Sequence, residues 1–421
     1  MTDDQASQSP RPVTAFRDGF TLDEVRSYRN ERSALDVANW FSGGDASVWF
    51  NLRSAEAFPA TAVVPNRLPP VYLARNINAE IGAIRVETEN FGAVTLDEFM
   101  ANPAGRGQAF MVVHRGEVVY ENFTGVRPTD NHLWMSVAKV VAGLLIDQLI
   151  SEGEIDELET MGTYVPGFRD SAWESVSVKD VMDMTTGLNV EEMVDGVSYA
   201  PGTIGQRVLL AEFGVSFEGE PELLLDVLRD AEPNKEAGSQ FDYSSAATQA
   251  LVYLAEAVTG TAWADLVDDK IWSHLHAEGP LLVHTSPDGI AIGHGMVASR
   301  LSDLARFGML YTPSWDKIAA KQVVTPEIIE RIQTGVRSHE FYVAGFGTEE
   351  ISNLNNSDMI SNARQWDAVW PDGDMFKSGF LRQALYVSPS RDLVIVIFSV
   401  SPEDDSIVRY LRPIATSGLF E

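Results

Sequence analysis

Cysteine is absent from this chain of 421 residues. Its absence excludes disulfide bonds, thiol nucleophiles, iron–sulfur clusters and cysteine-ligated zinc. Histidine is scarce, with 7 in the whole sequence and no H-E-x-x-H pattern, so the sequence predicts neither a metal centre nor a cofactor. The nucleotide-binding patterns G-x-x-x-x-G-K-[ST] and G-x-G-x-x-G are missing, and so is the G-x-S-x-G turn that carries the nucleophile in many hydrolases.

Positive charge is also in short supply. Lys and Arg together number 31 against 61 Asp and Glu, which gives a formal net charge of −30. Because a surface this acidic repels phosphate backbones and anionic lipid, we expect no nucleic-acid partner and no membrane partner. The longest apolar run, Val140–Ile150, contains Asp147 and Gln148 and is too short to span a bilayer. Residues Met1–Pro12 lack the features of a secretory signal, which predicts a cytoplasmic protein.

The composition is that of a large globular fold, with 45% apolar and 22% charged residues. The length predicts two or three domains, or one large fold with an insertion. Two β-rich runs flank the turn Arg115-Gly116 within Ala109–Phe123, and two more flank Ser388–Asp392 within Gln383–Val400. Each of these patterns predicts a β-hairpin.

Between the two hairpins, apolar residues recur at helical spacing. The predicted helices are Val140–Glu152, Val178–Met184, Glu222–Asp230, Ala246–Val258, Trp263–Leu275 and Ser302–Leu310, with a last one at Ser406–Ala415. Strands near both ends and helices between them favour an α+β fold with one antiparallel sheet. We therefore predict an irregular N-terminal extension over residues 1–80 that wraps the core, a sheet domain formed by 81–135 and 291–421, and a mostly helical domain over 136–290. The active site is expected between these parts.

One chemical pattern remains, a serine followed three residues later by a lysine. It occurs as Ser136-Val-Ala-Lys139 and as Ser314-Trp-Asp-Lys317. Side chains three residues apart on a helix share a face, so the serine can pass its proton to the lysine. The lysine must be neutral to accept that proton, which requires burial or nearby positive charge to lower its pKa.

The surroundings distinguish the two copies of this pattern. Ser314 lies in a polar loop where Asp316 would keep Lys317 charged, so we interpret this copy as part of the surface. Ser136 lies where a loop enters an apolar helix, and its backbone N–H at the positive helix end can stabilise an oxyanion. Lys139 has apolar neighbours and can be buried with the helix. The alternative for this copy is a helix-capping serine beside a lysine that reaches solvent.

Four segments occur along the chain in the order His132–Lys139, Phe241–Ser245, Gly293–Arg306 and Lys377–Gly379, and the last of them reads K-S-G. They resemble the motifs of the serine β-lactamase and penicillin-recognising superfamily, over about residues 85–420. The similarity is greatest to class C β-lactamase-like esterases and the 6-aminohexanoate-dimer hydrolase group. The resemblance implies a β-lactamase/DD-peptidase-like fold, in which an antiparallel sheet flanked by helices carries an inserted, mostly helical domain.

By this resemblance, Ser136 would be the nucleophile that forms an acyl-enzyme, and Lys139 would be the base. Tyr243 would carry the proton to the leaving group, with two nearby ammonium groups favouring its phenolate form. Lys377 would supply one of these charges and would also pair with a carboxylate on the substrate. The backbone N–H groups of Ser136 and Phe380 would form the oxyanion hole. A buried structural tyrosine and a solvated lysine are the alternatives for Tyr243 and Lys377.

The resemblance also implies a set of substrate-binding residues, namely Ser245, His294, Met193, Trp366, Ser378 and Gly379. Ser245 stands where many relatives have Asn, so it lacks an amide donor for the substrate. Met193 aligns where amide-cleaving members have a tyrosine, and a thioether cannot donate a hydrogen bond to an amide nitrogen. His294 is alternatively a structural histidine, and Trp366 is alternatively a core residue.

These features lead us to expect a serine hydrolase that cleaves small carboxylic esters, acting as a monomer or homodimer. The first alternative is an amidase or D-amino-acid peptidase that acts on 6-aminohexanoate oligomers or β-lactams, and acyl transfer to an alcohol stays open. A ligand-binding protein of the same fold without turnover is a different class, and metal-dependent hydrolysis is a third.

Overall fold

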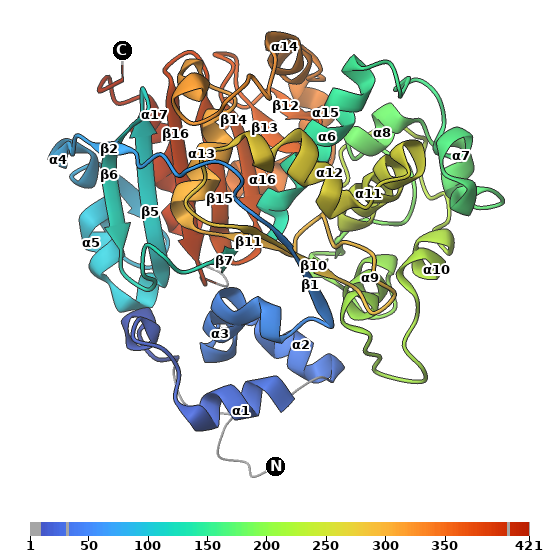
Figure 1. Ribbon diagram of the computed structural model, residues 1–421, viewed down its shortest axis with the longest axis horizontal. Coiled ribbons are helices and arrows are strands. Elements are labelled where there is room, and N and C mark those ends of the chain that lie inside the picture. Colours follow the sequence, from blue (N-terminus) through green and yellow to red (C-terminus); the bar gives the residue numbers. More distant parts are fainter. Residues whose placement is uncertain (1–9, 31–32, 402–404, 421) are drawn as a thin grey trace.

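The largest element of the fold is an eight-stranded sheet (Figure 1). The computed structural model describes residues 10–30, 33–401 and 405–420. In spatial order, the strands are β12 (Ser361–Ala363), β13 (Trp366–Val369), β14 (Met375–Gly379), β15 (Gln383–Ser388), β16 (Leu393–Ser399), β5 (Gly107–His114), β6 (Glu117–Phe123) and β2 (Ala74–Arg75). Neighbouring strands are antiparallel except for β2, which pairs parallel with β6.

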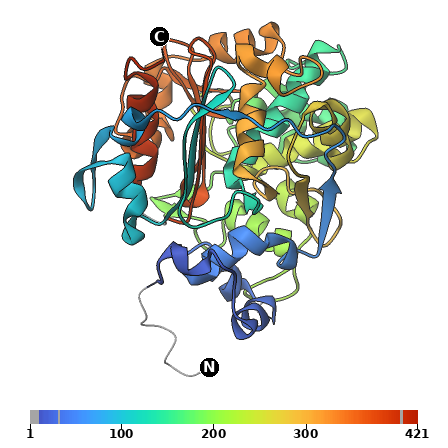
Figure 2. The same ribbon diagram turned by 60° about the vertical axis from the view of Figure 1, so that its left-hand side comes forward.

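Both predicted hairpins are present, and they lie side by side in this sheet. β16 of the second hairpin pairs with β5 of the first, from Leu393 opposite His114 to Ser399 opposite Gly107. β16 reads LVIVIFS, and every residue in it is buried. A strand without polar alternation requires cover on both faces. Figure 2 shows that cover, with α13 (Leu301–Met309) on one face and α5 (Leu96–Ala101) and α17 (Leu411–Ala415) on the other.

The helical prediction for the middle of the chain is confirmed with shifted ends. Besides α13, the helices are α6 (Lys139–Ser151), α8 (Val178–Met182), α10 (Leu224–Arg229), α11 (Ser245–Thr259) and α12 (Trp263–Lys270), and the predicted C-terminal helix is the 3₁₀ helix η10 (Asp405–Tyr410) followed by α17. The sequence did not indicate α4 (Ala79–Gly82), α5, α7 (Met161–Tyr164), α9 (Ile204–Phe213), α14 (Pro326–Thr334), α15 (His339–Ala344) and α16 (Gly347–Leu354). Most of these span two turns or fewer, which is too short to show a helical period.

The lengths of the helices bear on the expectation that the chain has no membrane-spanning segment. Within the described residues, no single helix is long and apolar enough to cross a membrane. In the same part of the chain, the pair formed by Ser245–Thr259 and Trp263–His274, bent by 77°, passes this test of length and composition.

The N-terminal extension is more regular than predicted. Instead of irregular chain it contains α1 (Leu22–Asn30), α2 (Ala34–Trp40) and α3 (Asp45–Arg53), so this part of the prediction was wrong. Aromatic packing explains the difference, because Trp40 and Phe50 are buried against Phe213 of α9, with ring centroids 5.4 and 5.9 Å away. Isolated helices this short need such tertiary contacts to form.

A second, smaller sheet positions the S-x-x-K segment. Its strand order is β1 (Ala60–Val64), β10 (Leu281–Thr285), β11 (Val297–Ser299) and β7 (His132–Leu133), and the remaining strands form the pairs β3 (Arg85–Thr88) with β4 (Gly92–Thr95) and β8 (Met193–Val194) with β9 (Val197–Ser198). β7 leads directly into the 3₁₀ helix η4 (Met135–Ala138) and then α6. The Trp134 backbone N–H donates to the Val297 carbonyl over 2.8 Å, which ties this turn to β11.

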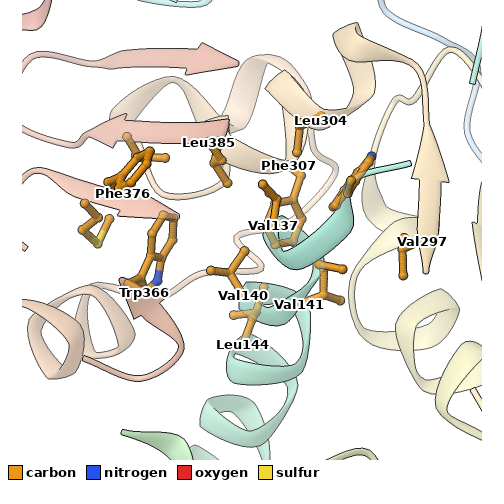
Figure 3. Close-up of a cluster of buried hydrophobic side chains, with 14 of the residues drawn as sticks. Val137, Val140, Val141, Leu144, Val297, Leu304, Phe307, Trp366, Phe376 and Leu385 are labelled. Carbon is orange, nitrogen blue, oxygen red and sulfur yellow. The ribbon is translucent and has the colours of Figure 1, made fainter. Parts of the chain in front are cut away.

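The first turns of this helical segment are embedded in the core (Figure 3). Val137, Val140 and Leu144 are at most 2% exposed and lie among side chains from α13 and the large sheet, including Phe307 and Phe376. Burial of each such side chain contributes roughly 1.5–3 kcal/mol. The segment that carries Ser136 and Lys139 is therefore fixed between the sheet and the helices.

Candidate active site

Ser136 and Lys139 meet where η4 passes into α6. Their side chains are hydrogen-bonded, with 2.8 Å between Lys139 Nζ and Ser136 Oγ. Met135, directly before the serine, has a φ of +49°. A residue with a side chain adopts this left-handed conformation only when its surroundings impose it, and such residues cluster at functional sites. The strained turn places Ser136 on the wall of a cavity.

Lys139 is completely buried and has several partners. Its Nζ also bonds to Ser245 Oγ over 2.8 Å and to the His294 carbonyl over 3.1 Å. Burial lowers the pKa of Lys139 to about 8, against the opposing effect of the Glu192 carboxylate 3.6 Å away. The Lys377 ammonium lowers this pKa further. A lysine in this setting is partly neutral near pH 8, as a base must be.

Tyr243 lies against both lysines. Lys377 Nζ donates to the tyrosine hydroxyl over 3.3 Å, and the Nζ atoms of Lys377 and Lys139 lie 4.5 and 5.0 Å from its ring centroid. The neighbouring Ser136 side chain lowers the pKa of this hydroxyl. Burial, followed by the carboxylates of Asp367 and Glu192, nevertheless raises the pKa of Tyr243 well above 10. The direction of this pKa is opposite to the one expected from two nearby ammonium groups, because burial and the two carboxylates outweigh them.

Lys377 is not available to a substrate carboxylate, contrary to the prediction from the K-S-G segment. Its side chain is fully buried and forms an ion pair with Asp367. The same carboxylate accepts hydrogen bonds from the backbone N–H and the hydroxyl of Ser378, over 2.8 and 2.6 Å. Asp367 thus neutralises the lysine and holds the end of β14 in place.

The predicted oxyanion-hole residues lie close together because β14 ends against the turn before Ser136. A Cβ at Gly379 would come within 2.7 Å of the Trp134 carbonyl oxygen, so only glycine permits this approach. Phe380 follows immediately and lines the same cavity as Ser136. Leu381, with a φ of +60°, turns the chain away behind it. This arrangement suits two backbone N–H donors aimed at one carbonyl oxygen.

The cavity has two lobes that both include Ser136. The small lobe, about 10 Å³, has room for about one water molecule. The large lobe, about 230 Å³, extends past Tyr243 towards α16. The predicted substrate-binding residues on these walls are Ser245 and His294 in the small lobe and Met193, Ser378 and Gly379 in the large lobe.

Trp366 does not line either lobe, so the prediction that it contacts substrate was wrong. It is 2% exposed, and its ring packs edge-on against Tyr311 with centroids 5.3 Å apart. Figure 3 shows it within the hydrophobic cluster around α6. An aromatic residue at this point of the sequence belongs to the core because β13 is buried along its whole length.

Two glutamates that the sequence reading missed organise the small lobe and the lysine. Glu212 of α9 pairs with His294 Nε2 at 2.5 Å, so the predicted substrate-contacting histidine already has a buried partner. Glu192 accepts a hydrogen bond from Ser245 and another from the Tyr199 hydroxyl, the latter over 3.1 Å. No pattern in the sequence connects these residues, which come from separate loops and helices.

Asp367 was also missed, although a signal for it exists. In the antiparallel pair β13–β14, Ala368 faces Phe376, and continuing this register places Asp367 opposite Lys377. A predicted hairpin over this region would have indicated the ion pair. Phe41 of the N-terminal extension, which lines the small lobe, could not be found because the extension was predicted to be irregular.

Among the described residues, no group of three or more His, Asp or Glu side chains is placed to hold a metal ion. The site holds a serine hydrogen-bonded to a buried lysine, with a tyrosine beside them, between an antiparallel sheet and a helical region. Fold and site together define the class, a serine hydrolase with a β-lactamase-like fold.

Comparison with known proteins places the chain within this class. Residues 94–415 match the family model described as Beta-lactamase, and the chain belongs to that family. The 6-aminohexanoate-dimer hydrolase of Paenarthrobacter ureafaciens is 28% identical over 301 residues, which cover 71% of this chain and 74% of the relative.

Solved structures agree on the fold. A Bacillus anthracis protein provisionally assigned as a 6-aminohexanoate-dimer hydrolase has a TM-score of 0.76 at 22% identity, covering 92% of this chain and 96% of its own. EstCE1, a hydrolase with promiscuous acyltransferase activity, has a TM-score of 0.54 at 16% identity, covering 74% of this chain and 94% of its own. The α+β prediction and the resemblance to this superfamily are confirmed.

Proposed function

We propose that this protein hydrolyses linear carboxamides through an acyl-enzyme on Ser136. The observation that carries the proposal is the 2.8 Å hydrogen bond between Ser136 and a fully buried Lys139, whose pKa burial lowers to about 8. With that pKa, about a tenth of the lysine is neutral at pH 7 and about half at pH 8. A base poised near the working pH combines availability with driving force for proton transfer.

In the proposed reaction, Ser136 Oγ attacks the carbonyl carbon while its proton passes to neutral Lys139 Nζ. The carbonyl oxygen becomes an oxyanion that accepts hydrogen bonds from the backbone N–H groups of Ser136 and Phe380. The C–N bond then breaks as the leaving nitrogen takes a proton from the Tyr243 hydroxyl, and the proton held by Lys139 restores the tyrosine. Water attacks the acyl-enzyme, which releases a carboxylic acid and regenerates Ser136. The raised pKa of Tyr243 supports its role as a neutral donor.

Glu192 favours an amide over an ester. It lines the large lobe together with Ser136, and the Tyr199 hydroxyl donates to it over 3.1 Å and holds it in place. The Glu192 carboxylate can accept a hydrogen bond from the amide N–H. An ester has no N–H for Glu192. The 28% identical relative, a 6-aminohexanoate-dimer hydrolase, supports the same choice.

Cleavage of small carboxylic esters is the second candidate, and Ser245 favours it. Its hydroxyl is already hydrogen-bonded to Lys139 and Glu192, so it has no free donor for a substrate amide. An alkoxide also leaves without the protonation that an amine requires. Acyl transfer to an added alcohol would proceed through the same acyl-enzyme.

The test begins with a fluorophosphonate probe and intact-mass measurement on wild type, Ser136→Ala and Ser314→Ala. We expect one adduct on wild type and on Ser314→Ala, and none on Ser136→Ala. A folded wild type without an adduct would refute the serine-hydrolase proposal and favour a ligand-binding protein. A matched pair of an anilide and an ester with the same acyl group then compares kcat/KM values. Ester cleavage without any anilide cleavage would overturn the amide assignment.

A further inference from the structure

The two lobes of the cavity differ in which part of a substrate they can take. Tyr243, which gives its proton to the leaving nitrogen in the proposed reaction, lines the large lobe but not the small one. The leaving amine therefore belongs in the large lobe, which has about 230 Å³ of space. The acyl group extends from the other side of the carbonyl carbon, and the small lobe of about 10 Å³ is the space beside Ser136 that is left for it.

The walls of the small lobe are mostly apolar. Two of its polar wall groups already have partners, since His294 Nε2 is paired with Glu212 at 2.5 Å. The other, Ser245 Oγ, accepts a hydrogen bond from Lys139 over 2.8 Å. Because burying a charge without water is costly, so small a lobe suits a short uncharged group. The apolar side chains on the walls are Phe41, Met135, Val208, Leu209, Met296 and Phe380.

Phe41 is the contribution of the N-terminal extension to this wall. It follows α2 directly, and its ring centroid lies 5.5 Å from those of Phe380 and Phe50. Trp40, directly before it, is buried and stacks on Phe50 with centroids 5.1 Å apart, which fixes the end of α2. The family match begins at residue 94, so this part of the wall comes from a segment outside that match.

We propose that the substrates are carboxamides formed by a short acyl group, acetyl or propionyl, and a larger amine, and that Phe41 sets this limit on acyl length. The inference rests on the proposed function and narrows its substrate class. Ser136 takes up the acyl group as the C–N bond breaks and the amine leaves, and water then releases acetate or propionate. A longer acyl chain would have to displace the Phe41 ring from Phe380 and Phe50, and packed rings resist such displacement.

The first test varies the acyl group while the leaving amine stays the same. Wild type is assayed with the p-nitroanilides of acetic, propionic, butyric and hexanoic acid. We expect kcat/KM to fall by roughly tenfold or more from the acetyl to the hexanoyl substrate, because a single methylene in an apolar pocket is worth about that much. Equal values, or a preference for hexanoyl, would overturn the proposal.

Variants of Phe41 assign the limit to this side chain. Phe41→Ala should raise the ratio of hexanoyl to acetyl kcat/KM by roughly tenfold or more, and Phe41→Leu should raise it less. Phe20→Ala makes the same change at another half-buried position of the extension, one that lines neither lobe, and should keep the wild-type ratio. The leucine variant provides the answer if the alanine variant does not fold. A wild-type ratio in a folded Phe41 variant would contradict the assignment.

Varying the leaving side checks which lobe takes which group. The acetyl group is kept, and the amine is ammonia, butylamine or p-nitroaniline, with release of acetate as the measurement. We expect Phe41→Ala to change kcat/KM for the three amides by the same factor, because their amines lie in the large lobe. A change in their ranking would place the amine against Phe41 and overturn the proposal.

Intact-mass measurement separates this inference from the proposed function. Wild type is mixed with the p-nitrophenyl esters of acetic and hexanoic acid, and the acyl adduct on Ser136 is followed with time. We expect the acetyl adduct to form faster, and this difference to shrink in Phe41→Ala. Adducts that form equally fast in wild type would refute the limit on acyl length and leave the proposed reaction standing. No adduct and no hydrolysis with any substrate would refute the proposed function, and the limit with it.

Discussion

The S-x-x-K pattern occurs twice in this chain, and the two copies have opposite surroundings. Lys139 is fully buried and bonded to Ser136, Ser245 and a backbone carbonyl. In the other copy, Lys317 is exposed and its Nζ donates to the Arg115 carbonyl over 2.6 Å. The Ser314 hydroxyl donates to Asp392 over 2.6 Å rather than serving the lysine.

The difference shows that the tetrapeptide alone does not make a base. Ser314 and Lys317 belong to a 3₁₀ segment, Pro313–Lys317. Ser314 bonds to Asp392 in the turn between β15 and β16, and Lys317 bonds to Arg115 in the turn between β5 and β6. Ser136 and Lys139 begin a helix that enters the core. Burial in low dielectric disfavours the charged form of an amine, and Lys139 is buried whereas Lys317 is exposed.

The largest difference in activity between the two copies is expected when the serine hydroxyl of each is removed. Ser136→Ala is expected to lower kcat/KM by roughly 10⁴-fold or more, because no acyl-enzyme forms. Ser314→Ala should stay within about threefold in activity but lose about 1–3 kcal/mol of stability with its bond to Asp392. Steady-state kinetics and urea unfolding measure the two effects. Similar losses of activity in both variants would contradict the distinction.

Removing each amine tests the base. Lys139→Met should reduce kcat by roughly 10²–10⁴-fold, because general-base assistance from the buried amine is lost. Lys317→Met should leave kcat unchanged, since its amine bonds only a turn carbonyl in the described structure. Single-turnover acylation rates distinguish loss of the base from slower product release. A circular-dichroism spectrum confirms that each variant is folded.

Tyr243→Phe tests the tyrosine that lies beside Lys139 in the buried copy of the pattern. The change removes the hydroxyl that accepts a hydrogen bond from Lys377, and we expect roughly a 10²-fold lower kcat on an anilide. The loss should be smaller on a p-nitrophenyl ester, whose leaving group needs no proton. Equal losses on both substrates would indicate a structural role for the hydroxyl instead.

The pH profile gives the smallest and sharpest effect. Because Lys139 must be neutral to accept the proton and its pKa is lowered to about 8, kcat/KM should rise as the pH increases towards 8 and level off above it. The rise between pH 7 and 8 should be roughly fivefold. Lys317→Met should retain this limb, which checks that the exposed copy does not produce it. A flat profile from pH 6 to 9 would contradict the assignment of Lys139.

Much of the architecture was predictable because its signals are local. Apolar, β-rich runs on either side of Arg115-Gly116 and of Ser388–Asp392 indicated the hairpins, and helical spacing indicated α6 and α11. The N-terminal helices were not predictable, because Trp40 and Phe50 become core residues only through contact with Phe213, over 150 positions later. Their hydrophobicity has no readable period in so short a stretch.

The candidate site also has a part that the sequence predicts and a part that only the folded structure decides. Ser136, Lys139, Tyr243 and Lys377 could be selected from the sequence, because motif residues keep their spacing and order along the chain. Which of them carry charge could not, because that depends on Asp367 and Glu192, which approach only in the folded structure. The α+β class and the order of motifs follow from short-range pattern. The buried lysine, the raised pKa of the tyrosine and the ion pair of Lys377 with Asp367 follow from burial and cross-strand register, which exist only once distant segments are packed together.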